Sequence, residues 1–348
     1  MKTTSISIPT LVRIKRGALD RLGVYARRNQ LYKVVLFYNK ELDPALVERV
    51  DEAMHEEGIE ILQHFEVVSS SFDQAQELFQ AMPSSANAIF AFGGGKALDI
   101  AKYVAFLGQI PYVASPTALS NDAFCSPQSS LEFKGKKRSF PAAIPYGVVI
   151  DTEVCLNAPM ILWLSGIGDL VSKITAVYDW KLAHKIKGTQ VDDFAALLSD
   201  ATVFQLMAKP EHDLDGIKLL GTALMLNGIA MAICGSSRPA SGSEHLISHA
   251  LDQICKKPRL HGLQVGTATY LISQLQGQGT TKIAKLLDDT GFWDMIKTDP
   301  FIKEEWVAAF KMAPTIKNDF YTILSEKDQV PDLIKIMETD PRLKNIFT

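Results

Sequence analysis

The stretch Ala88-Ile-Phe-Ala-Phe92-Gly93-Gly94-Gly95-Lys96-Ala-Leu-Asp-Ile-Ala-Lys102 decides the fold. Its first five residues form an apolar run of strand length, and a segment with helical periodicity follows the glycines. A strand, a turn without side chains and a helix start leave backbone N–H groups and a positive helix end free for a phosphate group. A tight strand-to-helix turn without a ligand has the same pattern. The stretch alone therefore predicts an anion near a helix N-terminus and nothing more specific.

Short β-rich runs alternate with helical patterns around this stretch. The β-rich runs cover residues 34–38, 59–65, 88–92, 112–115 and 147–151, and the helical patterns cover 43–56 and the residues after Phe72 and Lys96. Strands separated by helical crossovers imply a parallel sheet. After Asp151 the sequence changes to long apolar-periodic segments. We therefore predict an α/β, Rossmann-like nucleotide-binding domain over residues 1–153 and an all-α domain over residues 154–348.

Length and composition agree with a folded two-domain protein. The chain has 348 residues, 47% of them hydrophobic and 22% charged, and its net charge is −3. This charge gives no reason to expect nucleic acid or an anionic membrane as a partner. The N-terminus lacks the apolar core of a signal peptide, and the longest apolar run, residues 219–234, is short for a membrane span. Membrane insertion is therefore not expected.

The four cysteines are Cys125, Cys155, Cys234 and Cys255. They show no C-x-x-C spacing and no disulfide density, which favours a reducing, cytoplasmic location.

A polar loop follows the β-rich run 112–115. It reads Ser115-Pro-Thr-Ala-Leu-Ser-Asn-Asp122-Ala-Phe-Cys-Ser126. In a parallel sheet such a loop lies at the carboxyl ends of the strands, where doubly wound folds bind ligands. An ordinary turn-rich connection is an equally good interpretation of these residues alone.

Three of the seven histidines gather between residues 245 and 261. His245 and His249 are four residues apart and share one face of a predicted helix, and His261 follows. Catalytic divalent metals take imidazole and carboxylate ligands, and Asp169 in Ser165-Gly-Ile-Gly-Asp169 is a suitable carboxylate. A helix N-cap explains Asp169 equally well. No H-E-x-x-H motif is present, which argues against a zinc protease.

Five segments in order carry a resemblance to a known family. They are FGGGKALDIAK, SPTALSNDAFCSP, GIGDLVSK, SGSEHLISHALD and HG. Together they resemble the glycerol-1-phosphate dehydrogenase branch of the iron-containing alcohol dehydrogenase, glycerol dehydrogenase and dehydroquinate synthase superfamily, over residues 12–266. The resemblance implies an N-terminal nucleotide-binding domain and a C-terminal helical domain, with a metal in the cleft between them.

The resemblance also implies roles for individual residues. It gives Asp169, His245 and His261 as metal ligands, and Asp122 and His249 as catalytic residues near the substrate. It gives Gly94, Gly95 and Lys96 as the pyrophosphate loop, Asp99 on the following helix, and Thr117, Ser120 and Ser126 as further residues at the cofactor. The implied cofactors are NAD(H) or NADP(H) and one divalent metal, with zinc expected and nickel or iron also compatible.

The implied reaction interconverts dihydroxyacetone phosphate and sn-glycerol 1-phosphate by hydride transfer, a step in phospholipid metabolism. The metal would act as a Lewis acid, and Asp122, His249 or water would deliver the proton. The first predicted strand ends Phe37-Tyr38-Asn39-Lys40, where strictly NAD-dependent relatives often have an Asp, so the resemblance leaves the choice between NAD and NADP open. The basic segment Lys134-Gly-Lys136-Lys137-Arg138 is a possible seat for the phosphate, or simply a solvated loop.

Other functions remain open at this point. An unphosphorylated polyol dehydrogenase such as a glycerol dehydrogenase would use the same metal and cofactor. A dehydroquinate synthase-like cyclase is a second alternative, and a dinucleotide-binding protein without activity is a third. We expect a small phosphorylated polyol as the substrate and a homo-oligomer as the assembly.

Overall fold

A parallel sheet forms the centre of the first of two compact units in the computed structural model, which describes residues 8–348. This unit contains the chain up to Ala158 together with Asp213–Ala232, and the second contains Pro159–His212 and Ile233–Thr348. The predicted domain boundary at residues 153 and 154 stays a prediction. The prediction that no signal peptide is present depends on residues 1–7, which lie outside the described part of the chain.

The sheet has six strands in the order β1-β8-β5-β4-β2-β3, and all neighbours pair in parallel. The strands are β1 (Leu11–Lys15), β2 (Lys33–Asn39), β3 (Glu60–Val67), β4 (Ala88–Gly93), β5 (Tyr112–Pro116) and β8 (Gly147–Asp151). Every residue of β4 is buried, as its uniformly apolar sequence predicts for a central strand. The predicted parallel sheet is confirmed, but β1 was not predicted.

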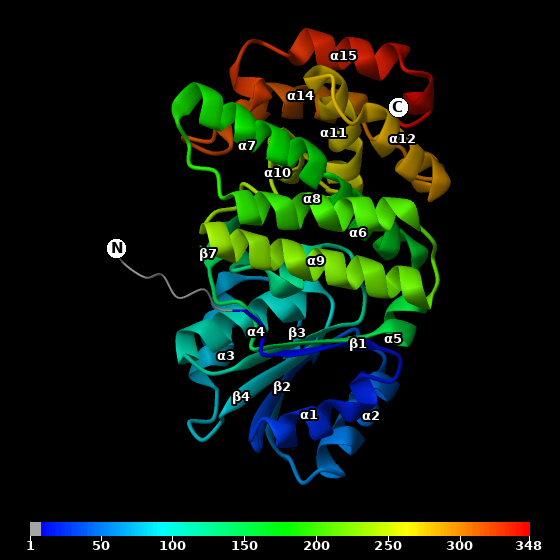
Figure 1. Ribbon diagram of the computed structural model, residues 1–348. Helices are drawn as coiled ribbons and strands as arrows, with labels where there is room; N and C mark the ends of the chain where they lie inside the picture. The colour runs from blue at the N-terminus through cyan, green and yellow to red at the C-terminus, as the bar shows by residue number, and fades with distance from the viewer. Residues whose placement is uncertain (1–7) are drawn as a thin grey trace. The chain divides into compact units, whose positions relative to one another are not determined.

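Helices cover both faces of the sheet. The helices of this unit are η1 (Leu19–Arg21), α1 (Leu22–Arg28), α2 (Pro44–His55), α3 (Phe72–Gln80), α4 (Gly95–Gly108), α5 (Thr152–Leu156) and α9 (Leu214–Cys234), with the short η2 (Asp122–Cys125). Residues of α1 and α2 share one apolar core with Leu36 of β2 and Phe90 of β4. Because strand side chains alternate, Ile89 and Ala91 of β4 face the opposite side, which α4 covers. Figure 1 shows α1 and α2 on one face of the sheet.

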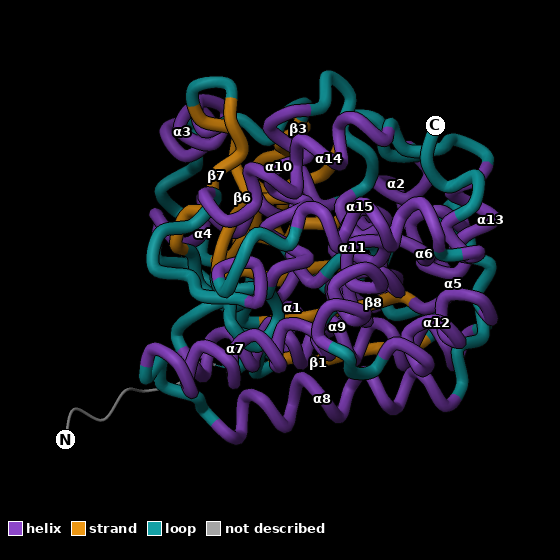
Figure 2. Tube along the Cα trace, turned by 90° about the horizontal axis from the view of Figure 1, so that it is seen from above, coloured by secondary structure: helices purple, strands orange, loops and turns teal. Residues whose placement is uncertain are grey.

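An antiparallel hairpin joins η2 to β8. Its strands are β6 (Gln128–Phe133) and β7 (Lys136–Pro141). Lys134 and Gly135 at the turn both have positive φ, 52° and 71°, as a two-residue type I′ turn requires. Phe72 of α3 packs against Phe133 and Phe140, so the hairpin lies beside α3 and α4 (Figure 2). From the sequence, this region was predicted to be a basic, hairpin-like loop, without its two strands.

The second unit is helical, as predicted. Its helices are α6 (Met160–Val171), α7 (Lys173–Lys187), α8 (Asp193–Ala208), α10 (Ser243–Ile254), α11 (His261–Gln276), α12 (Thr280–Asp289), α13 (Phe292–Lys297), α14 (Lys303–Met312) and α15 (Val330–Thr339), with the short η3 (Ala313–Thr315), η4 (Ile323–Ser325) and η5 (Pro341–Leu343).

Two helical segments of the described residues are long and apolar. Met160–Lys187 and Leu214–Cys234 are long and apolar enough to cross a membrane by length and composition alone. The sequence predicts that the apolar run 219–234 is too short for a membrane span, but the helix that contains it, α9, begins five residues earlier, at Leu214. In their most apolar windows, 78% and 61% of the residues are buried inside the structure. Such burial is typical of core helices.

Candidate functional site

Three side chains from three helices of the second unit converge. Asp169 of α6, His245 of α10 and His261 of α11 each offer one ligand atom, and these atoms all lie within 4.8 Å of one another. Asp169 and His245 are buried and His261 is partly buried. One carboxylate oxygen and two imidazole nitrogens at this spacing suit a divalent transition metal. The structure therefore brings together the three residues that the sequence analysis proposed as ligands.

Asp169 lies inside α6 and does not cap it. The N-cap of α6 is Pro159, so the interpretation of Asp169 as an N-cap is wrong. Lys173, one turn later on α7, places its Nζ 3.2 Å from Asp169 Oδ1. Burial alone would raise the pKa of Asp169, but Lys173 and the two histidines outweigh it and hold the pKa well below its usual range. Asp169 is therefore an anion in the folded protein.

Glu244 orients the ring of His245. His245 Nδ1 lies 2.9 Å from Glu244 Oε1, and His245 Nε2 lies 3.4 Å from Asp169 Oδ1. Burial would lower the pKa of His245, but the hydrogen bonds to Asp169 and Glu244 raise it overall. A doubly protonated His245 donates Nδ1–H to Glu244 and Nε2–H to Asp169, and loss of the Nε2 proton would leave a lone pair facing an anionic oxygen. A cation between Nε2 and Asp169 removes this conflict, which is the arrangement of a carboxylate–histidine–metal triad.

His261 has a neutral orienting partner. Ser248 Oγ donates a hydrogen bond of 2.8 Å to Gln264 Oε1 and lies 3.1 Å from His261 Nδ1. Because the single hydroxyl proton of Ser248 goes to Gln264, His261 Nδ1 is the donor to Ser248. This leaves the Nε2 lone pair of His261 available for a metal.

A close helix contact fixes the spacing of Asp169 and His261. A Cβ atom added to Gly168 would lie 2.0 Å from Gly262 O, and one added to Gly262 would lie 1.7 Å from Ser165 O. Only glycine fits at either position without moving a backbone. Since Asp169 follows Gly168 and His261 precedes Gly262, the contact between α6 and α11 positions two of the three side chains.

His249 lies beside the three residues. Its ring centroid is 6.3 Å from that of His245 and 5.9 Å from that of His261. The side chain is partly buried, and it does not belong to the group of mutually close ligand atoms.

The glycine turn of the first unit lies at the carboxyl ends of β4 and β2. Gly94 is the N-cap of α4, and no side chain caps this helix. The Gly94 N–H donates a 2.6 Å hydrogen bond to Asn39 Oδ1 at the end of β2. Gly93 has φ of +134°, and a Cβ there would lie 2.4 Å from Asn39 Oδ1, so a side chain is excluded. The N–H groups in the first turn of α4 remain available for an anion.

The loop after β5 meets this turn. The Thr117 N–H donates to Gly93 O at 3.0 Å, which places Thr117 beside the glycines. Ser120 and Asp122 follow in the same loop, and both are partly buried. Lys96 is exposed, and its Nζ lies 3.8 Å from Glu41.

Asp99 and Ser126 take part in a buried network around Lys102. Lys102 Nζ lies 3.1 Å from Asp99 Oδ1 and donates to Ala123 O at 2.6 Å. It also lies 3.4 Å from Ser126 Oγ, which donates to Gln128 O. Burial raises the pKa of Asp99 despite the opposing charge of Lys102. This network ties α4 to η2, and direct cofactor contacts of Asp99 and Ser126 stay predictions.

The residues that support the three converging side chains were not predicted from the sequence. Glu244, Ser248 and Gln264 lie beside His245 and His261, yet nothing in their spacing distinguishes them from other polar helix residues. Lys173 was detectable, because it lies four residues after Asp169 and this spacing brings helical side chains together.

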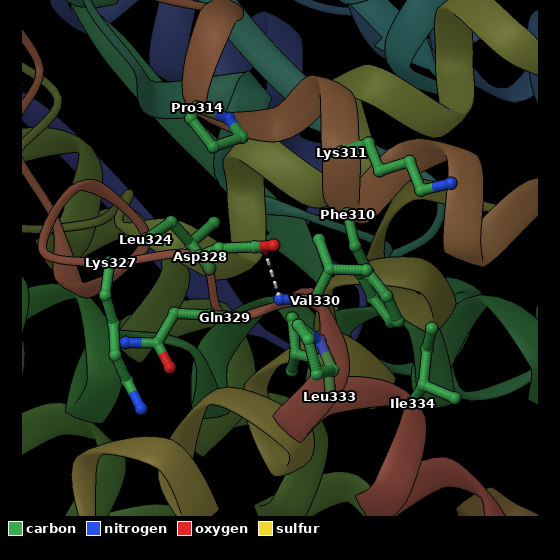
Figure 3. A pocket seen from close by; sticks show the side chains of 11 residues that line it. Phe310, Lys311, Pro314, Leu324, Lys327, Asp328, Gln329, Val330, Leu333 and Ile334 are labelled. Carbon is green, nitrogen blue, oxygen red and sulfur yellow. Dashed lines mark hydrogen bonds between the residues drawn. The ribbon is translucent and has the colours of Figure 1, made fainter.

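A separate cavity lies near the C-terminus. Its volume is about 670 Å³, and Figure 3 shows Asp328 and Lys327 at it together with apolar side chains such as Phe310 and Leu333. None of the predicted site residues lines this cavity. We therefore assign it no part in the candidate site.

The sequence is similar to that of a known family of dehydrogenases. A family model described as iron-containing alcohol dehydrogenase matches residues 13–159. A glycerol-1-phosphate dehydrogenase, NAD(P)+, of Metallosphaera sedula is 34% identical over 328 residues, which cover 92% of this chain and 93% of the relative. The enzyme of the same name from Pyrococcus furiosus is 40% identical over 241 residues, or 67% of this chain and 69% of the relative.

Solved structures share the fold. A glycerol dehydrogenase from Schizosaccharomyces pombe matches with a TM-score of 0.75 and 19% identity, covering 99% of this chain and 92% of that protein. A probable glycerol dehydrogenase from Sinorhizobium meliloti matches with a TM-score of 0.73 and 17% identity, covering 98% and 99%. These matches confirm the predicted fold class.

Proposed function

Because the chain belongs to the glycerol-1-phosphate dehydrogenase branch of the iron-containing alcohol dehydrogenase family, we propose that it is a metal-dependent dehydrogenase using NAD(P)(H). We propose dihydroxyacetone phosphate and sn-glycerol 1-phosphate as its substrate pair. The observation that carries the proposal is the convergence of Asp169, His245 and His261 within 4.8 Å.

We infer that these three side chains hold one divalent cation. When bound, this cation supplies a Lewis acid for the substrate carbonyl, and the reduced nicotinamide supplies the hydride. Asp169 contributes a negative charge, and the orienting hydrogen bonds of His245 and His261 leave one nitrogen of each ring free to bind. The ligand types favour zinc and also suit nickel and iron.

The first unit is our proposed nucleotide site. The uncapped N-terminus of α4 with Gly94, Gly95 and Lys96 suits a pyrophosphate, and Thr117 and Ser120 lie in the loop beside it. We keep the proposed division into a nucleotide-binding part, residues 1–153, and a metal-binding part, residues 154–348. Asn39 carries no charge that would repel a 2′-phosphate, so we propose that NADH and NADPH are both accepted.

Asp122 or His249 is our proposed proton donor to the alkoxide. The ring centroid of His249 lies 6.3 Å from that of His245 and 5.9 Å from that of His261. Asp122 begins η2 in the first unit. The variants Asp122→Asn and His249→Gln separate the two roles, because loss of the proton donor lowers kcat and changes the pH profile of kcat.

One assay tests the reaction. Purified protein is supplied with zinc, nickel or iron, and oxidation of NADH and of NADPH is followed with dihydroxyacetone phosphate and with dihydroxyacetone. We expect activity with the phosphorylated substrate that disappears on chelation and returns with metal. The His245→Ala variant should bind less metal and lose activity, whereas His55→Ala, on α2 of the first unit, should keep both.

Other outcomes would select an alternative. Activity with glycerol and dihydroxyacetone only would indicate an unphosphorylated polyol dehydrogenase. Absence of nicotinamide turnover with every polyol, together with bound metal and NAD, would leave a cyclase and a dinucleotide-binding protein without activity as the alternatives. We further propose a cytoplasmic location, a homo-oligomer and a role in phospholipid metabolism.

A further inference from the structure

Two cationic side chains of the second unit meet at one aromatic ring. The Arg238 guanidinium carbon lies 3.7 Å from the centroid of the Phe320 ring, and Lys317 Nζ lies 4.6 Å from the same centroid. Arg238 is buried and Lys317 is partly buried. Among residues 8–348, neither has a carboxylate within ion-pair distance. Buried charges usually have a partner, so this pair requires an explanation.

Hydrogen bonds to neutral groups hold both cations in place. Arg238 Nη1 donates to Tyr321 O at 2.6 Å, and Lys317 Nζ donates to Ser237 Oγ at 3.3 Å. Each cation keeps further N–H donors, because a guanidinium has five and an ammonium has three. Burial and the neighbouring Arg238 lower the pKa of Lys317 to about 8, with Glu244 acting in the opposite direction. An anion placed here would relieve the repulsion between the cations.

A buried hydroxyl lies in the same segment. Ser241 is three residues after Arg238, and its Oγ is buried without a hydrogen-bond partner among the described residues. Buried hydroxyl groups are nearly always paired in native proteins. Ser241 therefore offers a donor that the protein itself does not use.

The segment that carries Arg238 borders the proposed metal ligands. Lys173 Nζ bonds both Asp169 Oδ1 and Ala240 O, each at 3.2 Å. Ala240 is two residues from Arg238, and the same segment continues into α10, which carries His245. The segment that carries the Arg238 cation is therefore next to the place where a small molecule bound at Asp169 and His245 would lie.

The basic hairpin is a weaker seat for a phosphate. Lys134, Lys136, Lys137 and Arg138 are all exposed on β7 and its turn. Phosphate contacts at an exposed surface are screened by salt and water. The exposure fits the interpretation of this segment as a solvated hairpin.

We propose that Arg238 and Lys317, together with the hydroxyl of Ser241, bind the phosphate group of the substrate. This inference rests on the proposed function, because it concerns how that site selects a phosphorylated polyol over an unphosphorylated one. The cations provide charge-assisted hydrogen bonds, and removal of the phosphate from the substrate leaves them without an anion. A purely structural role for both cations, as a clamp on Phe320, predicts lower stability without any change in substrate preference.

The ratio of kcat/KM for dihydroxyacetone phosphate to kcat/KM for dihydroxyacetone tests the proposal in the metal-loaded enzyme. For Lys317→Met and Arg238→Met we expect this ratio to fall on the order of ten-fold or more, mainly through a higher KM for the phosphate ester. Lys317→Arg, which keeps the charge, should retain most of the ratio. Lys136→Met in the hairpin is the matched control and should leave it unchanged.

Binding of inorganic phosphate gives a second readout that does not depend on turnover of the phosphate ester. Calorimetry should show weaker phosphate binding to Lys317→Met than to the wild type, and this variant decides the question if Arg238→Met does not fold. Folded variants with wild-type ratios and wild-type phosphate affinity would overturn the proposal, as would a loss of the ratio in Lys136→Met. The two proposals can fail separately. If the wild type binds phosphate more tightly than Lys317→Met does but does not reduce dihydroxyacetone phosphate, the proposed reaction is refuted and the proposed phosphate site is supported.

Discussion

The Glu244→Gln variant tests whether a buried carboxylate tunes the proposed metal site. Glu244 is fully buried, and its Oε1 accepts hydrogen bonds from the Gly242 N–H at 2.6 Å and from His245 Nδ1 at 2.9 Å. Its Oε2 accepts from Thr175 Oγ1 at 2.8 Å. Glutamine has nearly the same shape, so the variant removes the charge and retains one acceptor oxygen. The His245 imidazole then becomes a weaker electron donor.

We expect metal affinity to fall 10- to 100-fold, or about 1.4 to 2.8 kcal/mol, as for other partners of metal-bound histidines. The fold should survive. Asp179 is a second buried carboxylate near Glu244, and its pKa is raised to about 7 by burial and by repulsion from Glu244. Loss of the negative charge at Glu244 relieves this repulsion. The loss of this charge should therefore not lower the free energy of unfolding of the metal-free variant through its effect on Asp179.

Competition with a calibrated chelator measures the affinity, and circular dichroism checks the fold. Glu304→Gln, at an exposed position in the first turn of α14, is the matched control and should bind metal as the wild type does. A folded Glu244→Gln variant with wild-type metal affinity would refute the reasoning. A folded variant with the expected loss would identify Glu244 as a positioning residue.

Three further predictions concern other parts of the chain. Gly262→Ala forces a Cβ to within 1.7 Å of Ser165 O, so we expect its free energy of unfolding in urea to be roughly 1–3 kcal/mol lower and its metal binding to be weaker. Gly95→Ala has open space around the new Cβ and should have the same free energy of unfolding as the wild type. Equal stability of the two variants would contradict the packing argument. Asn39→Asp should lower kcat/KM for NADPH about ten-fold relative to NADH, because a carboxylate repels the 2′-phosphate, and an unchanged coenzyme ratio would show that Asn39 does not face the ribose. As pH rises through about 8, the free enzyme should lose the charge of Lys317, which faces Arg238 and Glu244. The ratio of kcat/KM for dihydroxyacetone phosphate to kcat/KM for dihydroxyacetone should therefore fall. A similar fall in Lys317→Arg would exclude Lys317 as the titrating group.

The parallel sheet was predictable because its central strands are apolar on both faces and alternate with helical segments. Three strands were not recognised, the edge strand β1 and the two hairpin strands β6 and β7. β1 contains Arg13 and Lys15 at the edge of the sheet, and β7 is exposed along nearly its whole length. Neither strand has the buried apolar run that identifies a central strand, so their pairing depends on tertiary structure.

The motifs of the sequence were enough to identify the three proposed metal ligands, Asp169, His245 and His261, but they did not predict how these side chains are positioned. The N-cap interpretation of Asp169 failed because α6 starts at Met160 and extends through both glycines. Glycine usually weakens a helix, and the approach of α11 explains the glycine at position 168, where a Cβ would meet Gly262 O. The pairing of Arg238 with Lys317 joins residues 79 positions apart in the chain, which no local pattern encodes.

The contact of Gly168 with Gly262 O also has a consequence for how the proposed metal site would acquire its ion. Two of the proposed donors are attached to backbones already in van der Waals contact, so their separation is set before any ion arrives. Loading should then need little rearrangement, and it should be fast. A larger distance between Asp169 and His261, to suit a different ion, would require α6 and α11 to move together. Substitutions around the imidazole rings are therefore the more practical way to change the preferred ion.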